Sequence, residues 1–392
     1  MKNIIISFLC IFTISNALSQ QIDYQKDEKN ELLNFQKYII ENKQAASNVV
    51  LIHKDGKTVY YHAENSNKKG DKQITEDTIF PIWSMTKPIT TVAIMILYER
   101  GLIDLDDPVS KYIPSYSNLN CKGKDGLYKC KNQVKLVHLM AHTSGFLYYS
   151  TFMQDAYKSK SLEELIDKVA LRPLEFEPGT DYAYGLNQDI LGRVVEVASG
   201  KSFSQFMDDE IFIPLEMKNT KFYLSVEERD LFQPLYVNNG EIEGFSGLGI
   251  TGLNDFITYE IENKAHMGSQ GLVSTISDIS KFCEMLVNNG AYKNQRIITL
   301  ESIKIMTSKY ADGPHAGDID FPGVYNGLGF YVLENPKLMD FNAVKGIYGH
   351  GGYMSTEFFI DPKNSLYAVF LTRALTRYNH RFHFMKAVYD VF

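Results

Sequence analysis

The two ends of the chain alternate apolar and polar residues with the period of a strand. Residues 49–62, VVLIHKDGKTVYYH, alternate on either side of Asp55-Gly56, a dipeptide that accommodates the positive φ angles of a tight hairpin turn. Near the C-terminus, four short β-rich runs are separated by turn residues: 327–333, 345–352, 356–362 and 366–373. The pattern predicts antiparallel strands at both ends, covered by a helix over residues 381–392.

Between these ends the apolar residues recur with a helical period. The segments with this period, several of which close on the glycine expected at a helix C-terminus, are 90–101, 133–145, 161–170, 188–200 and 277–290. Strands from both termini must meet to form one sheet, so the helical part interrupts an α/β domain. We expect an antiparallel sheet flanked by helices, formed by residues 20–85 plus 265–392, with a mostly helical domain over 86–264. A cleft between the two lobes is the expected binding site.

The first residues have the layout of a secretory signal peptide. One early lysine precedes an apolar run from Ile4 to Ile14, and small or polar residues follow at Ala17 and Ser19. The alternative is a membrane anchor, but the run is shorter than the roughly 20 residues of a spanning helix. We predict a signal peptide over residues 1–19, and a periplasmic or secreted protein without a stable membrane span after cleavage.

The charge of the chain indicates which partners to expect. The 392 residues include 40 basic and 47 acidic ones, for a net charge of -7, and show no cluster of Lys and Arg that a nucleic acid would select. Nucleic acid is therefore not an expected partner.

Cys121 and Cys130 flank a polar, glycine-bearing loop, which predicts a disulfide in an oxidising compartment. Cys283 lies in a helical apolar pattern and is expected to be a buried free thiol. Because the pair is not CxxC, no metal site is expected.

The sequence holds two Ser-x-x-Lys patterns in different surroundings. Ser66 to Lys69 lies in a polar stretch that reads as a solvated loop. Ser84 to Lys87 lies in FPIWSMTKPITTVAIMIL, where the lysine precedes a helix that is apolar on all sides and hence buried. Pro88 fits only the first turn of that helix, where amide donors lack partners within the helix. Ser84 is therefore expected at the helix N-terminus.

This spacing suits nucleophilic catalysis. Residues three apart share a helical face, and the helix N-terminus favours negative charge developing at Ser84. A lysine in an apolar site tends to lose its proton, so Lys87 can accept the serine proton. The alternative is a capping serine beside a lysine that reaches the surface, which the apolar flanks and the proline disfavour.

Five segments, in this order, resemble the class C β-lactamase-like and penicillin-binding-protein-like serine hydrolases: FPIWSMTKPIT, AHTSGF, EFEPGTDYAYGLNQDILGRVVEVASG, SQGLVSTISDISKF and GHGGYMSTEFFIDP. The resemblance covers nearly the whole chain after the signal peptide, and it implies the β-lactamase/transpeptidase-like fold. It also implies that Tyr184, at the position of the tyrosine in the family's Tyr-x-Asn, shares proton transfer with Lys87. From the residues alone, Tyr182 would be an equally good choice.

The resemblance assigns His350, Gly351 and Gly352 to the strand on the opposite wall of the cleft. They stand where the family carries Lys-Thr-Gly or His-x-Gly, and by this analogy the amide of Tyr353 joins that of Ser84 as an oxyanion hole. The alternative is a strand end with a hydrogen-bonded histidine and a Gly-Gly turn.

Two departures from the family pattern favour an esterase. The family's Tyr-x-Asn is here Tyr184-Gly185-Leu186, so the asparagine is missing there, although Asn187 follows. His350 in place of lysine removes a fixed positive charge that would hold a substrate carboxylate. The segment from Tyr184 to Gly192 is also a residue shorter than in typical β-lactamases. It resembles the branch that contains carboxylesterases and acyltransferases, and His350 points the same way.

Other motifs are weaker. His138 and His142 are four apart on an expected helix, but HLMAH lacks the acid of HExxH. GFSGLGITG lacks the strand-to-helix context of a nucleophile elbow. Four aromatic residues either line an acyl pocket or belong to the core: Trp83, Tyr148, Tyr149 and Phe152.

We therefore expect a hydrolase that needs no cofactor, forms an acyl-enzyme on Ser84 and acts on small esters. Amide hydrolysis, as by a D-alanyl-D-alanine carboxypeptidase or a β-lactamase, and acyl transfer are variants of the same mechanism. A protein that binds ligands in the cleft without catalysis is the alternative of a different class.

Overall fold

The computed structural model describes residues 31–246, 263–312 and 323–392 except Arg377 and Asn379, together with Tyr259 and Ile261. The predicted signal peptide and most of GFSGLGITG lie outside the described residues. The predicted domain boundaries stay a prediction.

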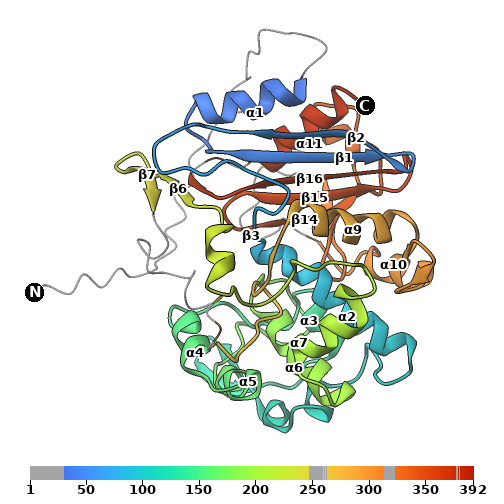
Figure 1. The fold of residues 1–392 in the computed structure, drawn as a ribbon. Coiled ribbons are helices and arrows are strands. Elements are labelled where there is room, and N and C mark those ends of the chain that lie inside the picture. The colour runs from blue at the N-terminus through green and yellow to red at the C-terminus, as the bar shows by residue number, and fades with distance from the viewer. Residues whose placement is uncertain are drawn as a thin grey trace, which may run out of the picture.

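An eight-stranded antiparallel sheet forms one layer of the molecule (Figure 1). Its strands, in spatial order, are β11 (Ala311–Asp312), β12 (Val324–Asn326), β13 (Tyr331–Leu333), β14 (Tyr348–Gly352), β15 (Thr356–Asp361), β16 (Leu366–Thr372), β1 (Asn48–Lys54) and β2 (Lys57–Glu64). The predicted hairpin is confirmed, with its turn at Asp55 (φ 50°) and Gly56 (φ 77°). Asn48 of β1 pairs with Thr372 of β16, so strands from the two chain ends meet in one sheet as predicted.

Helices cover both faces of this sheet (Figure 1). α1 (Glu31–Glu41) and the predicted C-terminal helix, α11 (Arg381–Tyr389), lie together on one face. Phe35, Phe370 and Phe384 pack between them and the sheet, with ring centroids 5.4 to 6.2 Å apart. α9 (Ile276–Val287) packs on the other face against β15 and β16. The predicted α/β class, with an antiparallel sheet flanked by helices, is confirmed.

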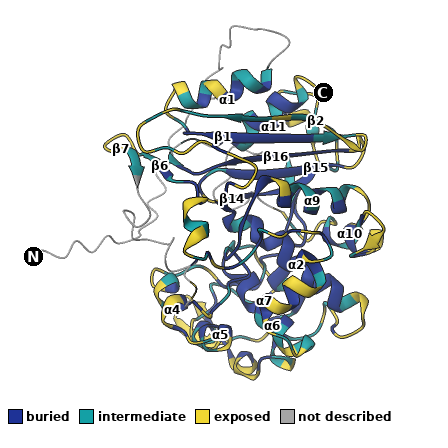
Figure 2. Cartoon of the chain, viewed as in Figure 1, coloured by how far each residue is buried: buried dark blue, intermediate teal, exposed yellow. Residues whose placement is uncertain are grey.

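The helical lobe packs around one buried helix. α2 (Thr86–Glu99) is buried at every position from Thr86 to Leu97, which explains why its sequence is apolar on all sides (Figure 2). The other helices are α3 (Leu136–Met140), α4 (Phe152–Lys158), α5 (Leu162–Ala170), α6 (Asn187–Ser199), α7 (Phe203–Met207), the π-helical η4 (Asp208–Phe212) and α10 (Leu300–Met306). The 3-10 helices are η1 (Trp83–Met85), η2 (Val109–Lys111), η3 (Pro114–Asn118), η5 (Glu227–Asp230) and η6 (Pro336–Leu338).

One expectation about this middle region needs correction. The helix expected over 133–145 ends at Met140, because His142 (φ 57°) and Gly145 (φ 88°) turn the chain with left-handed backbone. His142 is therefore outside the helix that was to carry it with His138.

Several short strand pairs also occur beyond those that the alternating pattern predicted. β4 (Asn120–Gly123) pairs with β5 (Gly126–Lys129), and β6 (Leu235–Asn238) lies between β7 (Glu243–Ser246) and β17 (Ala374–Thr376). Two further short pairs are β3 (Phe80–Pro81) with β8 (Val273–Ser274), and β9 (Ala291–Tyr292) with β10 (Gln295–Arg296). These strands are too short for an alternating pattern to reveal them.

The cysteines stand as the sequence suggested. Cys121 and Cys130 form a disulfide, with Cα atoms 5.1 Å apart, that closes the β4–β5 hairpin. Cys283 is buried in α9 as a free thiol. Across the described ranges, no helix is both long and apolar enough to cross a bilayer, and no group of three metal-binding side chains occurs.

Candidate active site

Ser84 lies in the 3-10 turn η1, directly before α2, and is partly exposed among buried neighbours. Trp83, the residue before it, holds a left-handed backbone conformation (φ 48°) that costs of order 1–3 kcal/mol in a residue other than glycine. Packing compensates this strain, because the buried Trp83 ring contacts Leu235 and Met354. The nucleophile segment is thus held at a sharp turn between strand β3 and helix α2.

Lys87 lies one turn further on, with its amine aimed at the serine. Its Nζ is 2.9 Å from Ser84 Oγ, 2.9 Å from the carbonyl oxygen of Ser269 and 3.2 Å from the hydroxyl of Tyr148. The side chain is fully buried, and this burial lowers the pKa of Lys87 to about 7, against a smaller upward effect of the Asp189 carboxylate. A substantial share of the molecules therefore carries a neutral amine at neutral pH.

The three partners satisfy the amine in both protonation states. The ammonium form donates one N–H to each of the three oxygens. The neutral form donates to the Ser269 carbonyl and the Tyr148 hydroxyl, and its lone pair then faces the hydroxyl hydrogen of Ser84. The proton of Ser84 can therefore pass to Lys87 without rearrangement of the site.

Two tyrosines stand beside the amine. The ring of Tyr184 has its centroid 4.6 Å from Lys87 Nζ, so the position indicated by the resemblance does lie at the site. The Tyr148 hydroxyl bonds directly to the amine, and burial raises the pKa of this phenol well above its ordinary value. The sequence offered Tyr148 only as an aromatic wall or a core residue, and its hydrogen bond to Lys87 is a contact that the chain pattern did not indicate.

The other aromatic candidates are placed differently. Phe152 is a core residue in α4, packed edge-on against Tyr148 and Tyr149. The ring of Tyr149 stacks with the guanidinium of Arg172, 4.2 Å away. Of the four aromatics that the sequence singled out, Tyr148 contacts Lys87 and Trp83 adjoins the serine.

Asn187 does not replace the missing asparagine of the family motif. Its Nδ2 donates to Nδ1 of His142 at 2.7 Å, and its Oδ1 accepts from the Ser144 hydroxyl. Both ends of this carboxamide are used inside the helical lobe. The His142 ring stacks at 4.6 Å on Tyr184, so this buried polar cluster supports the tyrosine from behind.

The end of β14 forms the opposite wall. Gly352 abuts the carbonyl of Ile82 and the hydroxyl of Thr356 so closely that a Cβ would overlap both. This approach brings Tyr353 to the nucleophile segment, where its ring meets Trp83 edge-on at 5.5 Å. Gly351 faces the other side of the sheet, where the ion pair between Arg381 and Glu357 leaves no room for a side chain.

His350 faces the cleft side of this strand. Its Nδ1 is 2.6 Å from the carbonyl oxygen of Gly351, and a carbonyl only accepts, so Nδ1 carries the proton. The His350 ring centroid lies 6.4 Å from that of Tyr184, which places both side chains at the same site.

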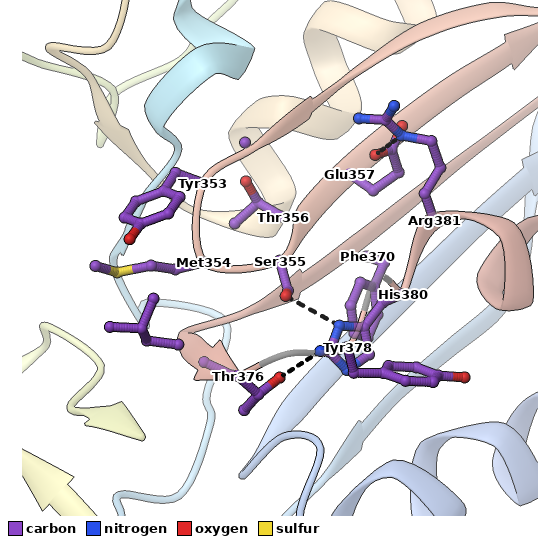
Figure 3. A pocket seen from close by; sticks show the side chains of 13 residues that line it. Tyr353, Met354, Ser355, Thr356, Glu357, Phe370, Thr376, Tyr378, His380 and Arg381 are labelled. Carbon is purple, nitrogen blue, oxygen red and sulfur yellow. Dashed lines mark hydrogen bonds and ion pairs between the residues drawn. The ribbon is translucent and has the colours of Figure 1, made fainter. Parts of the chain in front are cut away.

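Two hydrogen bonds hold the turn that follows Tyr353, one of which is drawn in Figure 3. Met354 (φ 67°) and Ser355 (φ 72°) both have left-handed backbone, which favours glycine. Nδ1 of His380 bonds to the hydroxyl of Ser355 at 2.9 Å, and the amide of Ala374 donates to the carbonyl of Met354 at 3.1 Å. A cavity of about 290 Å³ lies beside this hairpin, lined by residues that include Tyr353, Thr356 and Arg381. The strained turn therefore has a fixed conformation.

The second Ser-x-x-Lys pattern, Ser66 to Lys69, is separate from this site. The hydroxyl of Ser66 bonds to the carboxylate of Asp71 in the loop after β2, as expected for a polar loop. The site thus brings together Ser84, Lys87 and Tyr184 with the end of β14, and it adds Tyr148, Ser269 and Asp189.

The fold and the buried Ser-x-x-Lys pair define a serine hydrolase. The chain belongs to the β-lactamase family, which it matches over residues 35–385. It is 25% identical over 351 residues to a provisionally named D-alanyl-D-alanine carboxypeptidase of Escherichia coli (strain K12), over 82% of this chain and 77% of that protein. It is 30% identical over 194 residues to esterase EstB of Burkholderia gladioli, over 46% of this chain and 48% of that protein.

A similar solved structure is EstCE1, described as a hydrolase with promiscuous acyltransferase activity. The two share a TM-score of 0.78 at 23% identity, over 92% of this chain and 97% of that one. This likeness confirms the predicted β-lactamase/transpeptidase-like fold.

Proposed function

We propose that the protein is an exported esterase that forms an acyl-enzyme on Ser84 and hydrolyses small esters. The observation that carries the proposal is the 2.9 Å contact between Ser84 Oγ and the buried amine of Lys87, whose pKa is lowered to about 7. A neutral amine at this place acts as the base that a serine nucleophile requires.

The acylation step follows from this geometry. Lys87 takes the proton of Ser84 while Oγ forms a bond to the ester carbonyl carbon. The amides of Ser84 and Tyr353 stabilise the oxyanion. The carbon–oxygen bond to the alcohol then breaks, and the leaving alkoxide receives the proton from Lys87 through Tyr184 or Tyr148.

Deacylation repeats these steps with water. Water gives a proton to the amine and attacks the acyl carbon, and Ser84 leaves with the proton returned. The products are an acid and an alcohol, and the enzyme is restored.

The surroundings favour an ester without a carboxylate near the reacting bond. His350 stands where related hydrolases carry a lysine, so the fixed positive charge that would hold a substrate carboxylate is replaced by an imidazole. Aromatic rings of Trp83, Tyr148 and Tyr353 adjoin the nucleophile and suit an apolar acyl group. The similarity to EstB and EstCE1 supports the same choice.

Amide hydrolysis is the second candidate, supported by the long match to the E. coli carboxypeptidase. Acyl transfer to an alcohol in place of water is a third variant, supported by the description of EstCE1. Export is proposed from the signal-like residues 1–19. N-terminal sequencing of secreted protein should show cleavage near Ser19, and a sequence beginning at Met1 would contradict it.

The test is a comparison of the wild type with Ser84→Ala on p-nitrophenyl butyrate, a D-alanyl-D-alanine peptide and a chromogenic cephalosporin. We expect turnover of the ester by the wild type and its loss in the variant. Peptide mapping after treatment with a fluorophosphonate should place the adduct on Ser84. Faster turnover of the peptide or cephalosporin would replace the esterase proposal by amide hydrolysis, and failure to form any adduct would favour a binding protein without catalysis.

A further inference from the structure

Ser269 connects the catalytic lysine to a buried carboxylate. Its carbonyl oxygen accepts from Lys87 Nζ at 2.9 Å. Its own amide donates to Oδ1 of Asp189 at 2.8 Å, and its hydroxyl donates to Oδ2 of the same residue at 2.6 Å. Ser269 is thus held by both carboxylate oxygens of Asp189 and accepts a hydrogen bond from the amine of Lys87.

The segment before Ser269 is fixed between two helices. Thr90 of α2 donates its hydroxyl hydrogen to the carbonyl of Gly268 at 2.7 Å. On the other side, Gly268 lies so near the carbonyl of Gln188 in α6 that a Cβ would overlap it. Asp189, the third residue of α6, lies in the first helical turn, where free amides and the helix dipole favour a carboxylate. The carbonyl of Ser269 therefore has little freedom to turn away from the amine.

Resting on the proposed function, we propose that Asp189 is a positioning residue of the reaction: through Ser269 it orients the amine of Lys87, and its charge sets the pH range in which that amine acts as a base. Asp189 does not touch the substrate in this arrangement. Its influence passes through the carbonyl of Ser269 and through the field of its buried carboxylate.

The charges around the pair give the direction of the effect. Lys87 and Asp189 are both fully buried, and each charge favours the ionised form of the other. Burial raises the pKa of the Asp189 carboxyl above its ordinary value, against the hydrogen bonds of Ser269 and the attraction of Lys87. Without the negative charge of Asp189, the pKa of Lys87 falls further.

Other titratable groups also face this pair. The phenols of Tyr148 and Tyr116 feel the Asp189 charge, and the pKa of each is raised chiefly by burial. The rings of Tyr184 and His142 form the next layer, in contact with each other at 4.6 Å. His350 also lies near Tyr184, with ring centroids 6.4 Å apart. Both phenols stay protonated near pH 7 and the two histidines are the same in every variant, so a difference between the wild type and a variant reports on Lys87 and Asp189.

The test is the pH dependence of kcat/KM on p-nitrophenyl butyrate for the wild type and Asp189→Asn. Asparagine keeps the size and one acceptor oxygen but removes the charge. We expect the acidic limb of the profile to move down by about one pH unit, since a neighbouring opposite charge typically shifts a pKa by that amount or more. We also expect the plateau rate to fall about tenfold, because the ammonium formed during acylation loses its counter-charge and the Ser269 carbonyl loses its anchor.

Asp278→Asn is the matched control. Asp278 is also buried and also the third residue of its helix, α9, but it accepts from the amide of Asn219 and pairs with Lys281. Its substitution should cost stability and leave the acidic limb in place.

Ser269→Ala provides a second variant in case Asp189→Asn does not fold. It removes the hydroxyl bond to Asp189 and keeps the backbone amide and carbonyl. The acidic limb of the Ser269→Ala profile should also move to lower pH, by less than in Asp189→Asn. If the acidic limb of the folded variants stays at the wild-type pH or moves to higher pH, the inference is wrong. If Ser84→Ala keeps the esterase activity of the wild type, the proposed function itself is wrong.

Discussion

Replacing Lys87 with methionine should abolish activity and yet stabilise the protein below neutral pH. The unfolded chain holds this lysine at an ordinary pKa of 10.5, and the folded protein lowers it to about 7. A difference of about 3.5 pH units corresponds to about 5 kcal/mol of stability lost at pH 7 and below. Methionine removes this cost but leaves the buried carbonyl of Ser269 without its donor, which costs about 1–3 kcal/mol. The expected net gain at pH 6 is about 2–4 kcal/mol.

The sign of the pH dependence follows from proton counting. Between pH 7 and pH 10.5 the unfolded wild type binds more protons at Lys87 than the folded one, so wild-type stability rises with pH in this window. The advantage of the variant should therefore shrink by about 2 kcal/mol between pH 7 and pH 9. Asp189 also makes the advantage of the variant shrink as the pH rises. Without the positive charge of Lys87 the pKa of the Asp189 carboxyl rises further, so the folded variant is destabilised when this carboxyl ionises.

The assay is equilibrium urea unfolding, followed by far-UV circular dichroism at pH 6, 7, 8 and 9. The exposed Lys37 of α1 provides the control substitution Lys37→Met, whose difference from the wild type should be the same at each pH. A constant difference between Lys87→Met and the wild type across this range would refute the reasoning, since the folded protein would then not hold the amine neutral.

Three further predictions concern the site and its supports. Tyr184→Phe and Tyr148→Phe should each lower kcat/KM by about 10²–10⁴-fold if the phenol carries a proton, and wild-type rates in either variant would exclude that phenol from proton transfer. Gly352→Ala should abolish ester hydrolysis, because its Cβ would overlap the Ile82 carbonyl; a fully active variant would show that the β14 end tolerates displacement. Replacing both Cys121 and Cys130 with serine should lower the free energy of unfolding by about 2–3 kcal/mol without changing kcat, and a loss of kcat at full folding would show that the hairpin acts on the site.

The parts of the site that the sequence indicated are those joined by local backbone. Ser84 and Lys87 are one helical turn apart, so their spacing alone brings the hydroxyl and the amine together. The apolar residues of α2 indicated that this turn is buried. Tyr184 was reached only through resemblance, because nothing in its neighbourhood distinguishes it from Tyr182.

The contacts that the sequence did not indicate join distant segments. Tyr148 is 61 residues from Lys87 along the chain, and Ser269 is 182 residues away. The one signal for Asp189 was a carboxylate in the first turn of an expected helix, and such a residue ordinarily interacts favourably with the helix dipole. Which carboxylate, carbonyl and phenol meet the amine depends on how α2, α6 and the 268–272 segment pack.

The sequence by itself determined the elements whose physics is local: the β1–β2 hairpin, the buried helix α2, the C-terminal helix and the Ser84–Lys87 pair. Their turn residues and apolar periods act over a few residues, so no distant contact is needed to define them. Only the tertiary structure decided the contacts of Lys87 with Ser269 and Tyr148, the size of the shift in its pKa, and the close approach of Gly352 to Ile82. These properties depend on desolvation and on contacts between segments far apart in the chain, which exist only once the lobes have packed together.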